Sequence, residues 1–272
     1  GSKGSDSITI GVGANAGTTN IGAASIAIGC STSVRQASGI AIGNTALTTI
    51  TNGIAIGSLS KSQASDAIAI GSGAEAEAND TIAIGTDAGD TSAGGKGIES
   101  ISIGKNANSS TSNIGTQSIA IGVDSESIGT ASIAIGNGAN VAGVSYGIGI
   151  GYYTNVDNVH GIAIGYSAWA KGNYLISIGR EAGLNSGTIG QKAISIGDEA
   201  NNGSLGVGES SVTIGTFAFA PTNYMISIGH QAGNTAGSIG TGAIAIGYNS
   251  NGGGTSQDIG VNSIALGYCA RA

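Results

Sequence analysis

The sequence has very little proline, little aromatic bulk and few charged side chains. Its 272 residues include one Pro, two Phe and one Trp, and only 9% are Asp, Glu, Lys or Arg. Because 40% of the residues are hydrophobic, the composition is the reverse of that of a disordered chain. No apolar run approaches the roughly 18 residues of a membrane-spanning helix, and the N-terminus lacks a basic segment followed by an apolar one. We therefore predict a packed chain without direct membrane insertion.

Charge and glycine content exclude two further classes. The formal net charge of −7 leaves no basic surface to neutralise phosphates, so nucleic acid is not an expected partner. The 51 glycines make up about one fifth of the chain, whereas a collagen triple helix needs one third in strict register. The interior must therefore be built from isoleucine, valine and alanine.

A repeat runs through the whole chain. The motif Ile-x-Ile-Gly, with a few substitutions, occurs seventeen times. Successive copies are separated by 14 or 15 residues in nine cases and by 18 to 20 in seven, without a gap long enough for a linker. Its first residues are Ile8, Ile26, Ile40, Ile54, Ile68, Ile82, Ile101, Ile119, Ile133, Ile148, Ile162, Ile176, Ile194, Val212, Ile226, Ile244 and Ile264.

The motif predicts a short strand in each repeat. Large and small residues alternate with a period of two, and Ala, Ser or Thr always stands three positions after the motif glycine. One such repeat cannot bury its own apolar side, so successive laps must stack. We predict an all-β, single-stranded parallel β-solenoid of about 17 laps, continuous over residues 5–272 and ending within a repeat at Ala272. Residues 1–4, which begin Gly1-Ser2, are expected to be an expression scar or linker.

Six of the seven longer laps carry an additional apolar-Gly pair, five residues before the next motif, and the lap with Lys96-Gly97 at this position departs from the pattern. We predict that these insertions form wider loops along one edge of the solenoid or a small extra strand. The pairs are Ile21-Gly22, Ile114-Gly115, Ile189-Gly190, Val207-Gly208, Ile239-Gly240 and Ile259-Gly260.

The middle residue of Ile-x-Ile is small and never charged, which predicts an interface. We expect the isoleucines to face the core and the middle residues to form a flat exposed strip that packs against identical chains in a closed homotrimer. The trimer contacts would be Ala27, Ala41, Ala55, Ala69, Ala83, Ala120, Ala134, Ala163 and Ala245. Two alternatives remain: a monomer whose own second strand covers the strip, and an ice-binding face, for which only Thr9 and Thr213 supply the usual threonines.

These residues resemble a known family. Ser25-Ile26-Ala27-Ile28-Gly29, Ser132-Ile133-Ala134-Ile135-Gly136 and the segment from Gly161 to Gly172 are similar to the head repeats of trimeric autotransporter adhesins, the YadA-like head. The resemblance implies a left-handed β-roll, a homotrimer, and display on a bacterial outer-membrane surface. There such heads bind host surface proteins, matrix proteins or glycans and contribute to virulence. It assigns this role to the repeats collectively and not to single residues.

Two features depart from that family and leave a viral alternative open. The 18-residue laps, such as residues 228–240, are also similar to repeats in phage and viral fibres. Cys30 and Cys269 are unusual in an exported passenger, whereas a virion protein folded in reducing cytosol tolerates them. The chain would then be a receptor-binding or structural spacer segment of a fibre on a virion surface. In a solenoid the two cysteines lie too far apart for an intrachain disulfide, and Cys269 is predicted to be a small packed residue.

No catalytic, cofactor or metal site is predicted. Residues 143–147 match a nucleophile elbow in letters, but this elbow requires a strand-turn-helix context that the repeat does not offer. His160 and His230 lack metal-ligand spacing. Asp87 and Asp90 stand outside any Gly-Gly-x-Gly-x-Asp repeat, so they are interpreted as solvated acids.

The aromatic residues are confined to the second half of the chain, between Tyr146 and Tyr268. Trp169 and Tyr174 are matched fifty residues later by Phe219 and Tyr224, which predicts a repeated cluster that stacks on sugars or anchors a protein. The alternative is that these rings cap the roll or fill gaps between chains. The candidate ligand contacts are Trp169, Tyr174, Phe219, Tyr224, Tyr166 and Tyr152.

Overall fold

The computed structural model describes residues 4–15, 22–90, 97–109, 113–184, 190–203, 206–234, 240–251 and 260–272. The chain forms two compact units, unit 1 (Gly1–Gly138) and unit 2 (Ala139–Ala272). A single continuous roll through both units stays a prediction, as does a scar or linker at residues 1–4, of which 1–3 lie outside the described residues.

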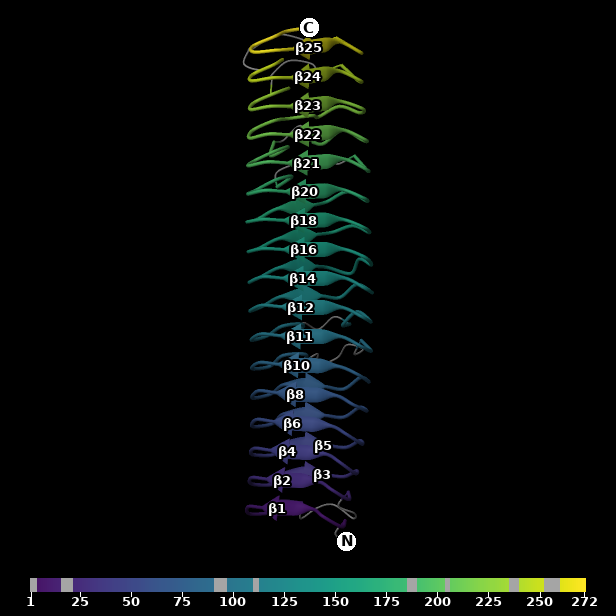
Figure 1. Ribbon diagram of the computed structural model, residues 1–272, viewed down its shortest axis with the longest axis vertical. Coiled ribbons are helices and arrows are strands. Elements are labelled where there is room, and N and C mark those ends of the chain that lie inside the picture. Colours follow the sequence, from purple (N-terminus) through teal and green to yellow (C-terminus); the bar gives the residue numbers. More distant parts are fainter. Residues whose placement is uncertain are drawn as a thin grey trace. The chain divides into compact units, whose positions relative to one another are not determined.

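Unit 1 is a stack of short parallel strands, one Ile-x-Ile strand in each lap (Figure 1). These strands are β1 (Ile8–Ile10), β2 (Ile26–Ile28), β4 (Ile40–Ile42), β6 (Ile54–Ile56), β8 (Ile68–Ile70), β10 (Ile82–Ile84), β11 (Ile101–Ile103), β12 (Ile119–Ile121) and β14 (Ile133–Ile135). Two-residue strands form a second wall: β3 (Ser33–Val34), β5 (Leu47–Thr48), β7 (Lys61–Ser62), β9 (Glu75–Ala76) and β13 (Glu126–Ser127).

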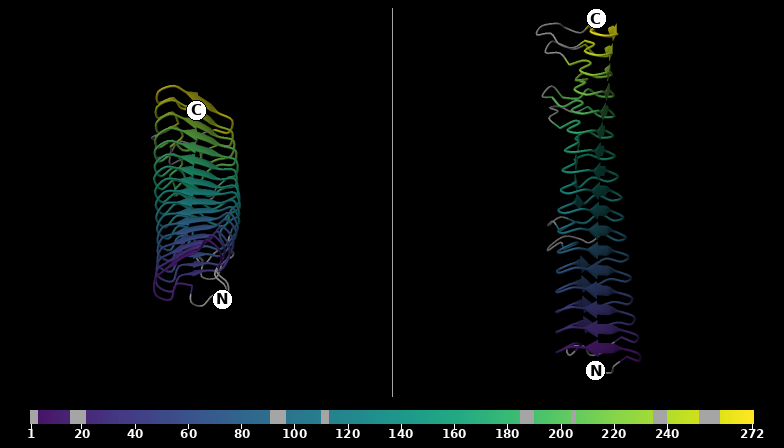
Figure 2. Two further views of the ribbon diagram at one scale, coloured as in Figure 1. Left: turned by 60° about the horizontal axis from the view of Figure 1, so that its bottom comes forward. Right: turned by 60° about the vertical axis from the view of Figure 1, so that its left-hand side comes forward.

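Unit 2 repeats the arrangement. Its Ile-x-Ile strands are β16 (Ile148–Ile150), β18 (Ile162–Ile164), β20 (Ile176–Ile178), β21 (Ile194–Ile196), β22 (Val212–Ile214), β23 (Ile226–Ile228), β24 (Ile244–Ile246) and β25 (Ile264–Leu266). Its second wall contains β15 (Asn140–Val141), β17 (Asn155–Val156) and β19 (Trp169–Ala170). Within each unit, the arrows of the Ile-x-Ile strands lie along one side of the coil (Figure 2).

Within each unit, successive Ile-x-Ile strands pair in parallel with one another. Within unit 1, for example, Ile40, Ala41 and Ile42 lie beside Ile54, Ala55 and Ile56. The predicted all-β parallel solenoid is confirmed. The described residues contain no helix, and none that could cross a membrane was found among them.

The motif glycine follows the Ile-x-Ile strand of each lap. Its backbone conformation is one that other residues rarely adopt. Its φ lies between 122° and 138° in every copy. At Gly57 an added Cβ would stand within 2.3 Å of the carbonyl oxygen of Gly71 in the next lap. The backbones of successive laps therefore approach closely at this corner.

The strands alternate as predicted, but their orientation is the reverse of the prediction. The middle residues point into the roll, while the isoleucines point outward and are half-buried or exposed. Nine alanines that were predicted to form an exposed trimer contact are 0–2% exposed within the single chain: Ala27, Ala41, Ala55, Ala69, Ala83, Ala120, Ala134, Ala163 and Ala245. They therefore cannot form an exposed strip. The ice-binding interpretation needed the same strip, so it has no exposed surface either.

The reason for this orientation is the narrow interior of the roll. The second wall comes close enough that Ala27, Ala41 and Ala55 share one buried cluster with Val34 and Ala46. Most of the buried side chains are Ala, Ser, Thr or Val, as expected between two walls that approach so closely, and Leu175 and Met225 in unit 2 are the largest that are fully buried. The second small position, three residues after the motif glycine, is buried in fifteen of the seventeen laps, directly before the second wall.

Longer laps differ from shorter ones at the fourth residue after the motif glycine. In all seven longer laps this residue is Asn or Gly with a φ between 49° and 69°, where the shorter laps continue the second wall. Buried Asn201 illustrates the result: its amide donates to Ser195 Oγ at 2.7 Å, and its Oδ1 accepts from the Ala220 N–H at 2.8 Å. A side-chain amide thus replaces the missing wall residue.

The apolar-Gly pairs of the longer laps are described only in part. Ile114 and Val207 are buried, at 7% and 3% exposure, so these two side chains pack into the roll. Val207 forms an isolated β-bridge, which agrees with the predicted alternative of a small extra strand. Ile21, Ile189, Ile239 and Ile259 lie outside the described residues.

Candidate functional site

The outer side of the Ile-x-Ile strands forms an apolar surface in each unit. We call the first and third motif residues the isoleucine face. Its residues are half-buried along the stack and exposed in the terminal laps, as at Ile8 (49%) and Leu266 (69%). In unit 1, nine laps at about 4.8 Å and a strand about 10 Å wide give an area on the order of 400 Å². Patches of this size on soluble proteins are often contact sites.

Two columns of turn residues border the isoleucine face. The leading edge consists of the residues two positions before each motif, all with a positive φ. The trailing edge consists of the residues directly after each motif glycine. The leading edge reads Asp6, Ala24, Ser38, Asn52, Asp66, Asp80, Glu99, Gln117 and Ala131 in unit 1, and Tyr146, His160, Tyr174, Lys192, Ser210, Tyr224, Gly242 and Asn262 in unit 2. The trailing edge reads Val12, Cys30, Asn44, Ser58, Ser72, Thr86, Lys105, Val123 and Asn137, then Tyr152, Tyr166, Arg180, Asp198, Thr216, His230, Tyr248 and Tyr268.

In unit 2 both edges carry stacked rings. On the leading edge His160 lies between Tyr146 and Tyr174, with ring centroids 5.0 and 4.9 Å apart and nearly parallel planes. On the trailing edge Tyr152 stacks on Tyr166 at 5.3 Å. The vertical repeat of the laps sets these spacings, because equivalent residues of successive laps stand above one another. Each stack adds favourable ring contacts and leaves the outer ring surfaces exposed.

The same trailing edge has its second stack near the end of unit 2. His230 stacks on Tyr248 at 5.0 Å, and Tyr248 on Tyr268 at 5.1 Å. Phe217 contacts His230 edge-on at 6.0 Å.

An ion cluster separates the two trailing-edge stacks. Arg180 Nη2 donates to Asp198 Oδ2 at 3.0 Å and to Glu199 Oε1 at 2.7 Å, and Glu181 lies 3.2 Å from Nη1. The hydrogen bonds to Asp198 and Glu199 raise the pKa of Arg180 above its usual value. One guanidinium thus faces three carboxylates, and the cluster keeps an excess of negative charge.

The six aromatic residues predicted as ligand contacts do not form one site. Tyr152, Tyr166, Tyr174 and Tyr224 lie on the edges of the isoleucine face and are 44–60% exposed. Trp169 lies on the second wall in β19. Its Nε1 donates to Asp157 Oδ2 at 2.8 Å, and Lys171 Nζ stands 3.6 Å from the ring centroid. The sequence repeat groups Trp169 with Tyr174, but the two residues lie on different sides of the roll.

Phe219 is a correction to that prediction, because it is only 7% exposed. Its ring lies against Gly203, where an added Cβ would be 3.1 Å from the ring. The lap of Phe219 stands between two longer laps, whereas the lap of Trp169 follows a shorter lap and precedes a longer one. Phe219 is therefore a packing residue and not an exposed ligand contact.

Both cysteines are exposed free thiols. Cys269 lies in a turn with a φ of 50°, so its prediction as a packed residue is wrong.

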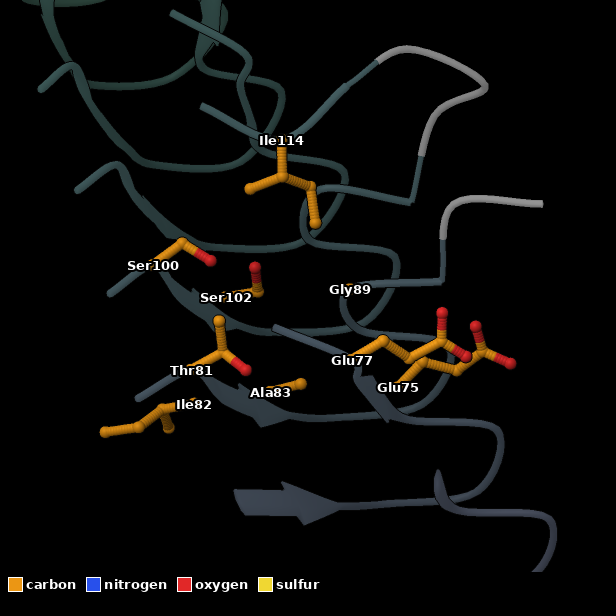
Figure 3. Close-up of a pocket in the computed structure, with 9 residues that line it drawn as sticks. All are labelled: Glu75, Glu77, Thr81, Ile82, Ala83, Gly89, Ser100, Ser102 and Ile114. Carbon is orange, nitrogen blue, oxygen red and sulfur yellow. The ribbon is translucent and has the colours of Figure 1, made fainter. Parts of the chain in front are cut away.

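One cavity in unit 1 is too small for a ligand. Figure 3 shows a cavity of about 10 Å³ whose wall includes Thr81, Ser102 and Ile114, while the carboxylates of Glu75 and Glu77 point away from it. This volume holds about one water molecule. Glu75 accepts a hydrogen bond from Lys61, which raises the pKa of that lysine.

A larger hollow lies on the outside of the second wall in unit 1. It has a volume of about 250 Å³ and is lined by Leu47 and Leu59 together with Arg35, Lys61 and the hydroxyls of Ser31, Ser33 and Thr45. Among the described residues no group of three or more His, Cys, Asp or Glu side chains is placed to hold a metal ion.

The fold and its faces define a repeat protein, a parallel β-solenoid with an apolar outer face. Residues 62–88, 114–139 and 158–182 match the family described as the YadA head domain repeat (2 copies). The resemblance stated from the sequence is confirmed in these three segments. The match to YadA head repeats suggests an adhesin-type function. No curated protein matches the chain.

Proposed function

We propose that the chain is the non-enzymatic head of a surface adhesin that binds a host receptor or extracellular matrix as a multivalent homotrimer. The observation that carries the proposal is the isoleucine face of each unit, in a chain with segments that match YadA head repeats. A rigid trimer presents three copies of every lap, so weak contacts combine through avidity. In this proposal the chain is displayed on a bacterial outer-membrane surface.

The isoleucine face, and not the buried alanine column, supplies the trimer contact in this proposal. The face lacks charge in every lap, because its positions hold only Ile, with Val212 and Leu266 as exceptions. Three copies arranged around a common axis bury all their faces at once and leave no apolar strip exposed. The contribution is large, at about 25 cal/mol for each Å² of apolar surface removed from water.

Light scattering tests the assembly directly. We expect a mass of three times the 26.0 kDa chain at micromolar concentration with reductant. Replacing Ile68 and Ile70 of β8 by Asp should shift the mass to the single chain, because six carboxylates would then be buried around the axis. Leu47→Asp, on the outer side of the second wall, is the matched control and should remain trimeric. A monomeric wild-type chain would contradict the proposal.

Within this trimer, Trp169 is the best-placed candidate ligand contact. It stands on the wall opposite the isoleucine face and therefore stays accessible when that face is covered. The hydrogen bond to Asp157 and the contact with Lys171 hold the indole ring in place. A fixed aromatic ring beside polar groups suits stacking on a sugar or insertion into a protein partner.

Removal of this ring should weaken adhesion. Trp169→Ala is expected to reduce binding of the purified chain to immobilised matrix proteins or cultured epithelial cells by about tenfold or more, the usual effect of losing an aromatic anchor. Leu47→Ala removes a half-buried apolar side chain from the corresponding wall of unit 1 and should leave binding unchanged. Equal binding by the Trp169 variant and the wild type would exclude the tryptophan as a contact.

A spacer in a viral fibre is the second candidate. The two exposed free thiols favour it, because they suit a protein that folds in a reducing compartment. A spacer would form the same trimer but would bind neither matrix nor cells, with or without Trp169.

A further inference from the structure

The surface available to a second copy is wider than the isoleucines. The two isoleucines of each strand face outward, and the leading-edge and trailing-edge residues lie in the turns directly before and after the strand, where most of them are exposed. The residues between them are inward, as in the lap of β2, where Ser25 and Ala27 are 1% and 0% exposed. Every lap therefore presents four outward side chains in a row, two isoleucines flanked by two turn residues.

We propose that each corner of the trimer joins the trailing edge of one copy to the leading edge of the next, lap by lap. This inference rests on the proposed trimer. Three identical units around an axis have their Ile-x-Ile strands running in the same rotational sense, so the end of one strand meets the start of the neighbouring strand. Rotational symmetry keeps equivalent residues of the three copies at the same height along the axis. Because the two edges of one lap are only six residues apart, they also lie at nearly the same height. The occupant of each edge is thus a second copy of this chain.

Charge complementarity between the two edges supports this arrangement. Only two laps have a charged carboxylate or amine on both edges, and both combine opposite signs: Glu99 with Lys105 in unit 1, and Lys192 with Asp198 in unit 2. Asp198 belongs to the cluster in which Arg180 faces three carboxylates, so a lysine from the neighbouring copy would balance its excess negative charge.

The rings of unit 2 follow the same lap-by-lap pattern. Each aromatic or His residue of the leading edge has an aromatic, His or Arg partner on the trailing edge of its own lap. The pairs are Tyr146 with Tyr152, His160 with Tyr166, Tyr174 with Arg180, and Tyr224 with His230. Such pairs form ring stacks or cation–π contacts when brought together. The rings that stack on one another within one chain thereby also contact the neighbouring chain at the corner of the trimer.

A shift by one lap fits less well. It would place Lys192 against Arg180, a contact between like charges, and Glu99 against Thr86. The matched register removes both mismatches.

Cysteine pairs distinguish the two registers in the full chain. In a background with Cys30→Ser and Cys269→Ser, Glu99→Cys is combined with Lys105→Cys for the matched register. Lys105→Cys with Gln117→Cys is the control for a shift of one lap. An intrachain bond is excluded for the matched pair, because six residues of extended chain span about 20 Å and a disulfide needs Cα atoms within about 7 Å.

After oxidation, the matched pair should run mainly as a covalent trimer on a non-reducing gel, with at least about tenfold more trimer than the shifted pair. An equal or stronger band from the shifted pair would overturn the inference, and so would absent cross-links in a sample that light scattering shows to be trimeric. A monomeric mass would instead refute the underlying trimer. Lys192→Cys with Asp198→Cys repeats the comparison independently in unit 2.

Charge exchange provides a second readout without cysteines. Glu99→Lys should raise the concentration at which the trimer dissociates, and adding Lys105→Glu should restore the wild-type value. A double variant that dissociates as readily as the single one would contradict the pairing.

Discussion

Replacing Ala55 by leucine should destabilise unit 1 strongly, whereas replacing its neighbour Ile54 by leucine should have little effect. Ala55 is 0% exposed and packs in the cluster that contains Val34 and Ala46. Three added heavy atoms have no free volume between the two walls, so the laps must separate, at a cost of about 1–3 kcal/mol or more. Ile54 points outward and keeps its volume, so the change should cost less than about 1.5 kcal/mol.

Urea unfolding measures the difference, with the midpoint falling at an unchanged slope. The comparison also tests the orientation of the strand. If the isoleucines faced the interior, as the sequence alone suggested, Ala55→Leu would be tolerated on the surface and Ile54→Leu would be the more disruptive change.

The period of the motif was sufficient to predict strands, stacking and the parallel register, but not which side of the strand faces inward. An alternating pattern fits either orientation of the strand, because both the isoleucines and the alanines are apolar. The missing information was the distance between the two walls. A signal was present in the second wall, where charged Lys61 and Glu75 occupy the outward phase and Ser62 and Ala76 the inward phase. Because the inward side chains of the second wall are small, the side chains that face them from the Ile-x-Ile strands are expected to be small as well.

The difference between lap lengths was visible in the sequence but was attributed to the wrong residues. The apolar-Gly pair recurs in the sequence, but the conformational difference between longer and shorter laps lies four residues after the motif glycine. Asn alone does not mark it, since Asn140 and Asn155 stand there in shorter laps and begin β15 and β17. In those laps Val141 and Val156 follow and favour the extended conformation.

The candidate ligand residues were predictable only as exposed or buried rings, and not as one site. Sequence spacing grouped Trp169 with Tyr174, yet a turn separates the second wall from the leading edge. Tyr174 joins a stack with His160 because equivalent residues of successive laps are superposed. Stacking between laps, and not proximity along the chain, decides which side chains meet in a solenoid.

The second large effect is expected at the motif glycine, where Gly57→Ala should unfold the laps around it. The φ of 136° is strained for any residue with a Cβ, at about 1–3 kcal/mol. The added Cβ would also stand 2.3 Å from the oxygen of Gly71, so the backbone of the next lap must move. That movement breaks hydrogen bonds such as Gly71 N–H to Ile56 O, now 2.7 Å, each worth about 1 kcal/mol.

Gly143→Ala is the matched control, because Gly143 also has a positive φ, 67°, but no atom lies within 4 Å of an added Cβ. Its cost should be limited to left-handed strain of about 1–2 kcal/mol. Neighbouring repeats stabilise one another through their shared interface, so the Gly57 defect should first appear locally, as faster amide hydrogen exchange in β6 and β8. If both variants unfold at the same urea concentration, the close approach of the glycine column is not what holds adjacent laps in register.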